Sequence, residues 1–150
     1  MKYRSEFSFN KQATMSRFFN ISEAASIGIH SMVLIAKSEE RLNVTRISEI
    51  MNFSRHHVAK VMQRLAKAGM VESTRGPAGG FVLAMAPDEI TLLLIYEAIE
   101  GKIVETECPL GYDDCPFNKC LLDTMAENIN KAFKEYLLTH TLEYYLLNGY

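Results

Sequence analysis

The sequence predicts a mainly α-helical fold with one small β-hairpin, and three observations support this fold class. Apolar residues recur at helical spacing through most of the 150-residue chain. Two short β-prone runs, MVEST and FVLAM, flank the Gly/Pro-containing segment RGPAGG, which is the pattern of a hairpin. Hydrophobic residues make up 48% of the chain and charged residues 23%, values typical of a globular protein.

The first two helices are expected before residue 52. Residues 21–37, ISEAASIGIHSMVLIAK, have a helical composition, and Ser22 is placed to cap their amino-terminal end. A second helix is expected over residues 44–51. Its apolar positions are Val44, Ile47, Ile50 and Met51.

A third helix follows the short break at Asn52 and Phe53, with Ser54 as its expected N-cap. One apolar stripe on this helix consists of Val58, Val61, Met62 and Leu65. The polar residues that lie away from the stripe are Arg55, His56, Lys60, Gln63, Arg64 and Lys67. Gly69 is the expected stop, since glycine commonly ends a helix.

The hairpin comes next, and three further helices are expected after it. TLLLIYEAIEG follows Asp88 and Thr91 and ends at Gly101. A long amphipathic helix is marked by Leu122, Met125, Ile129, Ala132, Phe133 and Tyr136. TLEYYLL near the carboxyl end predicts a short final helix.

Charge is unevenly distributed along the chain, which has a net charge of −2. Residues 43–83 carry six basic and two acidic side chains, whereas residues 84–150 carry four basic and twelve acidic ones. A basic middle suggests that this region faces a polyanion. No apolar run approaches the roughly 18 residues of a membrane span, and no secretory signal is evident, so we expect a cytoplasmic protein without a membrane partner.

Two short helices, a tight turn and a hairpin form the element order of a winged helix-turn-helix domain, which binds double-stranded DNA. The apolar stripe would anchor the third helix, and its polar face would contact bases and phosphates. Arg75, at the hairpin tip, would reach a phosphate or the minor groove. The residues predicted to contact DNA are Ser54, Arg55, His56, His57, Lys60, Arg64 and Arg75.

These residues also allow interpretations other than DNA binding. An amphipathic helix with a solvated basic face accounts for residues 55–69, although not for the hairpin or the charge distribution. His56 and His57 are adjacent and point in different directions on a helix, which favours DNA or solvent contact over shared metal binding. RGPAGG lacks the Lys-Ser/Thr pair of a phosphate-binding P-loop, and no helix follows it.

The run from Ile47 to Gly101 resembles the IscR/NsrR-type (Rrf-two) transcription regulators. In that family a helix-turn-helix is followed by a wing with the pattern R-G-x-x-G-G-Y/F-x-L-A and by a helix start E-I-S/T. Both patterns occur here, at residues 75–84 and 89–91. The resemblance covers about residues 20–147 and implies a homodimer that binds operator DNA, usually as a repressor. It also implies that the long helix pairs with its counterpart in the second subunit.

The three cysteines of the chain, Cys108, Cys115 and Cys120, lie in one Gly/Pro-containing segment. An odd cysteine count without a secretory signal argues against a disulfide framework, and grouped thiolates suit iron–sulfur or zinc. A structural zinc site, a thiol switch without metal and cysteines without a role remain alternatives. The resemblance favours an iron–sulfur cluster, because many family members bind one through three cysteines at this place. Whether it is 2Fe–2S or 4Fe–4S stays open, since the spacings of six and four residues depart from the equal spacings common in the family.

The fourth cluster ligand differs between branches of the family. In the IscR-like branch it is a histidine three residues after the third cysteine, where this chain has Asp123. In the NsrR-like branch it is an aspartate near the amino terminus of the other subunit, and the resemblance puts Glu23 of the partner subunit in its place. Glu23 is equally explained as a first-turn acid favoured by the helix dipole.

We therefore expect a regulator, a repressor, whose DNA binding is controlled by an iron–sulfur cluster that senses nitric oxide, redox state or iron and cluster supply. The expected organisation is an arm (1–15), a winged domain (16–100), a cysteine loop (101–120) and a dimerisation helix with a terminal segment (121–150). The alternative is a metal-free winged-helix regulator controlled by cysteine oxidation or a small ligand. An interaction module is a third hypothesis. An enzyme is not expected, since no nucleophile–base pair or paired-carboxylate pattern stands out.

Overall fold

The computed structural model describes residues 21–103, 117, 121–122 and 124–149. The expected arm and the three cysteines therefore lie outside the described residues. The chain divides into two compact units, of which one comprises Ile21–Val104 with Ala132–Tyr150 and the other Met1–Asn20 with Glu105–Lys131. The first unit contains the winged domain, and the expected mainly helical fold with a two-stranded hairpin is confirmed.

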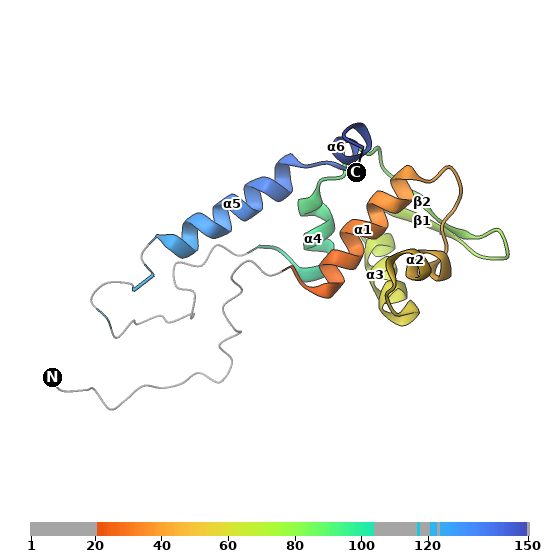
Figure 1. The fold of residues 1–150 in the computed structure, drawn as a ribbon, viewed down its shortest axis with the longest axis horizontal. Helices are drawn as coiled ribbons and strands as arrows, with labels where there is room; N and C mark the ends of the chain where they lie inside the picture. The colour runs from red at the N-terminus through yellow and green to blue at the C-terminus, as the bar shows by residue number, and fades with distance from the viewer. Residues whose placement is uncertain (1–20, 104–116, 118–120, 123, 150) are drawn as a thin grey trace, which may run out of the picture. The chain divides into compact units, whose positions relative to one another are not determined.

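Helix α1 (Glu23–Lys37) is the central helix of this unit (Figure 1). The Ser22 hydroxyl accepts a hydrogen bond from the backbone N–H of Ala25 at 3.0 Å, which confirms the expected N-cap. The helix packs on α3, α4, α6 and the hairpin. Gly28 permits one of these approaches, because a Cβ there would lie 2.1 Å from Cδ1 of Ile99 on α4.

Helices α2 (Val44–Met51) and α3 (Arg55–Lys67) form the expected helix-turn-helix. Asn43 caps α2, and Asn52 ends it with the positive φ of 55° that the turn requires. The predicted stripe of α3, consisting of Val58, Val61, Met62 and Leu65, is buried. The expected helix over residues 44–51 is confirmed, and one of its apolar residues, Ile50, remains 48% exposed. The short helix turns only part of its apolar face towards α3.

Strands β1 (Val71–Thr74) and β2 (Gly80–Leu83) pair in antiparallel register, from Val71 opposite Leu83 to Thr74 opposite Gly80. The hairpin projects away from the helices as a wing (Figure 1). The loop before α2 adds a bridge at its edge, since Leu42 and Phe81 exchange backbone hydrogen bonds of 3.3 and 2.9 Å. The sequence contains no sign of this third segment.

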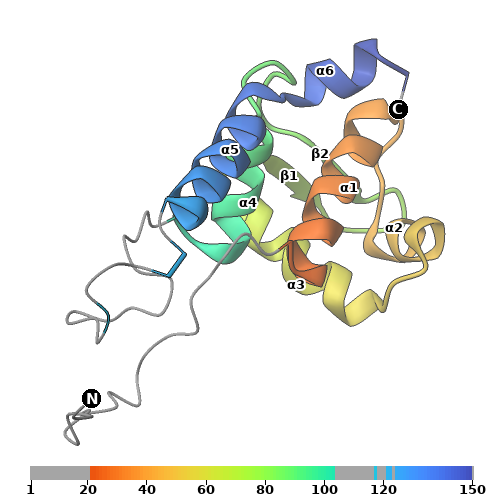
Figure 2. The ribbon, with the colours of Figure 1, turned by 60° about the vertical axis from the view of Figure 1, so that its left-hand side comes forward.

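The remaining helices are α4 (Leu92–Glu100), α5 (Met125–Thr139) and α6 (Leu142–Leu147). The caps of α4 and α6, Thr91 and Thr141, form an antiparallel bridge, so the end of the chain is held on the start of α4. Helix α6 also packs on α1 (Figure 2). Among the described helices, none combines the length and apolar character needed to traverse a bilayer.

Candidate nucleic-acid interface

The polar residues of α3 divide into two sets by their angle around the helix. With 3.6 residues per turn, His56, Lys60, Gln63 and Lys67 lie opposite the buried stripe. His57 and Arg64 lie on a flank, beside Val61. We call these sets the outer row and the flank pair.

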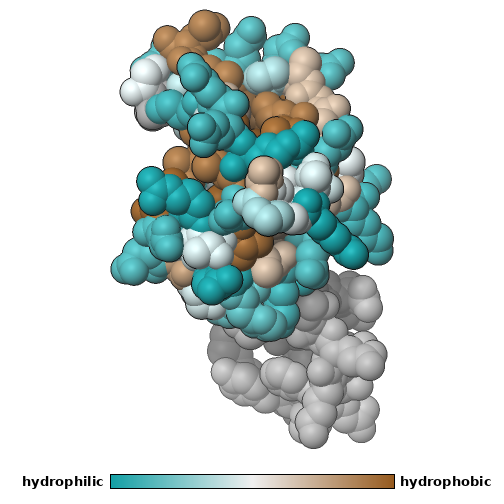
Figure 3. Space-filling view, turned by 90° about the vertical axis from the view of Figure 1, so that its right-hand side faces the viewer, coloured by the Kyte–Doolittle hydropathy of each residue, from teal (hydrophilic) through white to brown (hydrophobic). Residues whose placement is uncertain are grey.

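The outer row is exposed to solvent. The side chains of its four members, His56, Lys60, Gln63 and Lys67, make no hydrogen bond or ion pair within the described part of the chain. Arg55, the first residue of α3, is exposed as well. The face on the right of Figure 1 is covered mostly by hydrophilic side chains, with hydrophobic residues in patches between them (Figure 3). This composition suits contact with a charged, hydrated duplex.

Sequence reasoning did not select Gln63 and Lys67 as site residues, although it placed them away from the stripe. Their positions on the helix could have identified them as site residues, since both lie on the side opposite Val58 and Leu65. Gln63 has an amide that can pair with an adenine edge, and Lys67 has an ammonium that suits a phosphate.

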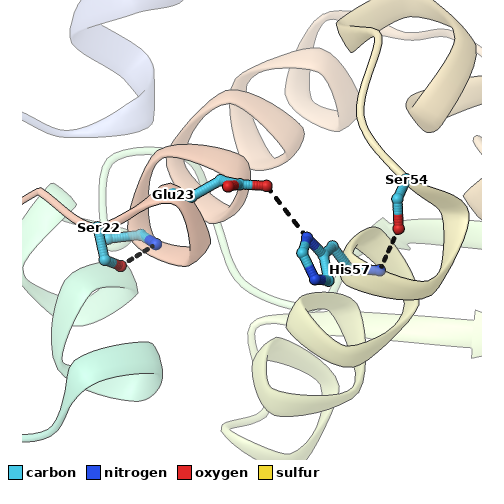
Figure 4. A network of polar contacts seen from close by, with 5 residues as sticks. Ser22, Glu23, Ser54 and His57 are labelled. Atoms are coloured by element: carbon cyan, nitrogen blue, oxygen red, sulfur yellow. Dashed lines mark hydrogen bonds and ion pairs between the residues drawn. The ribbon is translucent and has the colours of Figure 1, made fainter.

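Ser54 shapes the amino-terminal end of α3. Its hydroxyl accepts a hydrogen bond from the backbone N–H of His57 at 3.2 Å, which confirms the expected cap (Figure 4). The cap fixes where the helix begins and thereby the directions of Arg55, His56 and His57. The exposed amino-terminal turn also favours a nearby phosphate.

The flank pair contacts the chain's own neighbouring helices. Nδ1 of His57 lies 3.1 Å from Oε1 of Glu23, at the start of α1 (Figure 4). Nη1 of Arg64 donates to the backbone carbonyl of Ile99 at 2.7 Å, in the last turn of α4. Arg64 was predicted to contact DNA, and that contact stays a prediction; in the structure its guanidinium also bonds α3 to the last turn of α4. The carbonyls of a last helical turn lack intrahelical donors, so they accept such a bond readily.

A third polar contact completes this junction. Ser22 Oγ donates to Oε1 of Glu100 at 2.6 Å, which joins the start of α1 to the end of α4. We use the name junction for Ser22, Glu23, His57, Arg64 and Glu100, together with the Ile99 carbonyl. In the sequence, the cysteine-containing segment follows α4, whose last turn belongs to the junction.

A small cleft of about 290 Å³ opens beside the junction. Its floor is apolar, and Glu23, His57, Lys60 and Arg64 supply its charged or titratable groups. It is lined by Ser22, Glu23, Ala24, Ile27, His57, Lys60, Val61 and Arg64.

The wing presents Arg75 at its end. Thr74 and Gly80 form the last strand pair, and Arg75 follows as an exposed residue of the turn. Arg41, which the sequence analysis did not select, is exposed in the loop that contacts the hairpin, and its Nη1 donates to Thr74 Oγ1 at 2.9 Å. Only the folded chain brings these two arginines to one end of the wing.

Of the four predicted metal ligands, the structure describes Glu23. Cys108, Cys115 and Cys120 fall outside the described residues, and Glu23 is exposed at the start of α1 with His57 as its neighbour. Within the residues that the structure describes, no cluster of three His, Cys, Asp or Glu side chains could hold a metal ion. His56 and His57 do not form part of one, and their ring centroids are 6.5 Å apart.

Comparisons with known proteins agree with this architecture. A family model described as Rrf2, iron-dependent transcriptional regulator, matches residues 21–146. A helix-turn-helix-type transcriptional regulator of Neisseria meningitidis is 33% identical over 102 residues, which cover 68% of this chain and 69% of that protein.

Solved structures show the same fold. CymR, the global cysteine regulator of B. subtilis, superposes with a TM-score of 0.73 and 31% identity, covering 87% of this chain and 98% of that one. IscR of T. potens superposes with a TM-score of 0.70 and 25% identity, covering 87% and 88%. Because the family model spans most of the chain, this protein belongs to the Rrf2 family of DNA-binding transcription regulators and is not an enzyme.

Proposed function

We propose that the chain is a homodimeric repressor whose operator binding is controlled by an iron–sulfur cluster. Cys108, Cys115 and Cys120 would supply three thiolates, and Glu23 of the partner subunit would supply a carboxylate. This donor set fits the group, since soft thiolates bind iron–sulfur clusters and an oxygen ligand leaves one iron more exchangeable. Such a cluster supplies a centre that reacts with nitric oxide or oxidants.

The outer row of α3 would enter the major groove, and Arg75 would contact the backbone or the minor groove beside it. The residues proposed to bind DNA are Ser54, Arg55, His57 and Arg75 together with the outer row, His56, Lys60, Gln63 and Lys67. Arg64 supports α3 through the Ile99 carbonyl. The exposure of the outer row and of Arg75 supports this assignment.

The junction is the main observation that supports control of DNA binding by the cysteine-containing segment. The last turn of α4 is bonded to α3 through Arg64 and to α1 through Ser22, with bonds of 2.7 and 2.6 Å. The cysteine-containing segment begins directly after this turn. We propose that a change in that segment would reach the helix that carries the outer row through these two contacts of α4.

An exposed apolar stripe on α5 supports the homodimer. Met125, Ile129 and Tyr136 are 50%, 37% and 53% exposed and recur at helical spacing. An apolar stripe of this kind on a helix is typical of an interface. Two copies paired through α5 would present two α3 helices to two half-sites.

Anaerobic purification with a visible spectrum and iron and acid-labile sulfide assays tests the cluster. A brown protein with stoichiometric iron and sulfide, and a different operator affinity after the cluster is removed, is the expected result. Equal operator affinity with and without cluster would refute control by the cluster.

The similarity to CymR, described as a cysteine regulator, favours a second candidate function. In it, the same DNA-binding domain responds to cysteine oxidation or to a small ligand without metal. A colourless protein that stays free of iron after reconstitution, and whose DNA binding changes on mild oxidation, would select the oxidation version. Cys108→Ala and Cys115→Ala variants with unchanged regulation would select the ligand version.

A further inference from the structure

The loop between α1 and α2 is built onto the wing. Leu42 and Phe81 exchange two backbone hydrogen bonds, so residues beside Leu42 have fixed positions along strand β2. Ser38 stabilises the preceding turn, where its hydroxyl contacts both the N–H and the carbonyl of Glu40. The loop therefore holds its side chains in defined positions and forms a third segment of the wing, paired with the edge of β2.

Gly80 makes this close approach possible. A Cβ at Gly80 would lie 2.8 Å from the carbonyl carbon and 2.9 Å from the carbonyl oxygen of Leu42, closer than real contacts of this kind. The missing side chain lets the loop lie directly against the last strand pair, Thr74 and Gly80. Arg41 is thereby brought beside the end of β1.

Arg41 is anchored but not neutralised. Its Nη1 donates to Thr74 Oγ1 at 2.9 Å, a bond to an uncharged partner that leaves the other guanidinium donors available. Glu39 and Glu40 precede it in the loop, yet the ion pairs found in the described part of the chain are Arg46 with Glu49 and Glu23 with His57. Arg41 is thus an exposed cation of fixed position.

We propose that Arg41 is a second DNA-contacting arginine of the wing, which binds a backbone phosphate next to the one engaged by Arg75. Thr74 is its positioning residue, because it holds the guanidinium at the same end of the hairpin from which Arg75 projects. An arginine presents several donors in a planar fork that matches phosphate oxygens. The inference rests on DNA binding through the wing and is independent of control by the cysteines.

Equilibrium binding of the full-length protein at several salt concentrations tests the proposal. The probes are a duplex of about three helical turns, selected from a random library with the wild-type protein, and an unselected duplex of equal length. Arg41→Gln is expected to weaken binding to both duplexes by about tenfold near 0.1 M salt. The slope of log affinity against log salt should fall by about one, as for the loss of one phosphate contact.

Companion variants separate the parts of the proposal. Arg41→Lys, which retains the charge, should retain most of the salt slope, and Arg75→Gln combined with Arg41→Gln should weaken binding roughly multiplicatively. Thr74→Val should give a smaller loss than Arg41→Gln, since it frees the guanidinium without removing it. Lys102→Gln is the matched control, because it removes one exposed positive charge outside the wing.

Two results would overturn the inference. Suppose that Arg41→Gln binds both duplexes as tightly as Lys102→Gln does, while Arg75→Gln binds them more weakly. This result would show that Arg41 makes no DNA contact. If Arg41→Gln binds DNA more weakly but Thr74→Val binds it like the wild type, Thr74 does not position Arg41. Failure of Arg75→Gln and Lys60→Ala together to weaken binding would instead refute the proposed DNA interface as a whole.

Discussion

The two polar sides of α3 contain similar residue types, but they differ in what those residues contact. The flank pair, His57 and Arg64, contacts Glu23 on α1 and the Ile99 carbonyl on α4. The side chains of the outer row, which includes His56 and Lys60, have no hydrogen bond or ion pair in the described part of the chain. A histidine and a basic residue occur on each side. Their chemistry therefore does not separate the side chains that contact the chain's own helices from those left for an outside partner, whereas their position against neighbouring helices does.

The physical reason for the difference is the geometry around the flank. The amino-terminal end of α1 and the carboxyl-terminal end of α4 both meet α3 there. Helix ends leave backbone groups without intrahelical partners, and Arg64 satisfies one of them. The outer row lies opposite this packing and keeps its polar groups for a partner outside the domain. Each prediction below contrasts one side of α3 with another.

Leu65→Ala, on the buried stripe, should have the largest effect. Leu65 is completely buried, so the truncation should lower the free energy of unfolding by about 2–5 kcal/mol. Urea unfolding followed by circular dichroism measures it. A change no larger than that of Lys67→Ala, an exposed position on the same helix, would contradict the assignment of Leu65 to the core.

Arg64→Ala should come next and should also act on stability. The variant leaves the Ile99 carbonyl without its guanidinium donor, which should cost about 1.5 kcal/mol in the free energy of unfolding. Lys67→Ala is the matched control, since it removes a basic residue of α3 that has no partner in the described region. If Arg64→Ala weakens DNA binding at unchanged stability, Arg64 belongs to the DNA interface.

Lys60→Ala, in the outer row, should show the opposite pattern. Stability should be unchanged, whereas binding to selected and unselected duplexes should weaken by about tenfold near 0.1 M salt, because one phosphate contact is lost. Fluorescence anisotropy on both duplexes measures the affinities. Wild-type affinity in Lys60→Ala would remove the central cation from the proposed interface.

Glu23→Ala should have only a small effect on stability. The side chains of Glu23 and His57 are 57% and 56% exposed, and exposed pairs contribute less than about 1 kcal/mol to the free energy of unfolding. Urea unfolding beside Glu40→Ala, an exposed loop carboxylate, checks this. A loss as large as that of Leu65→Ala would show that the contact is an integral part of the packing. If the proposed cluster is present, Glu23→Ala should also lower the iron and sulfide content.

Local signals allowed much of the fold to be predicted. The caps Ser22 and Ser54 start their helices where expected, because a cap depends on residues within one turn. The stripe of α3 is buried as its period indicates. The hairpin follows from two β-prone runs around a turn. Each of these features is encoded within a short window of sequence.

Other features require contacts between distant residues, and these escaped prediction. Ile50 continues an apolar period but stays exposed, since α2 is short and covered on part of that face only. Arg64 bonds a carbonyl 35 positions away, and Arg41 bonds Thr74 33 positions away. Periodicity gives the face of a helix on which a residue lies. It contains no information about which other element approaches that face.

The sequence by itself therefore determined the helical class, the order of the elements, the wing and the family, because periodicity, caps and the R-G-x-x-G-G pattern are local properties of the chain. Only the tertiary structure decided which cations remain available for DNA. Whether a guanidinium or an ammonium is bonded within the chain depends on the elements that pack around it. The packing of α1, α4 and the loop at Arg41 arises only when the chain is folded.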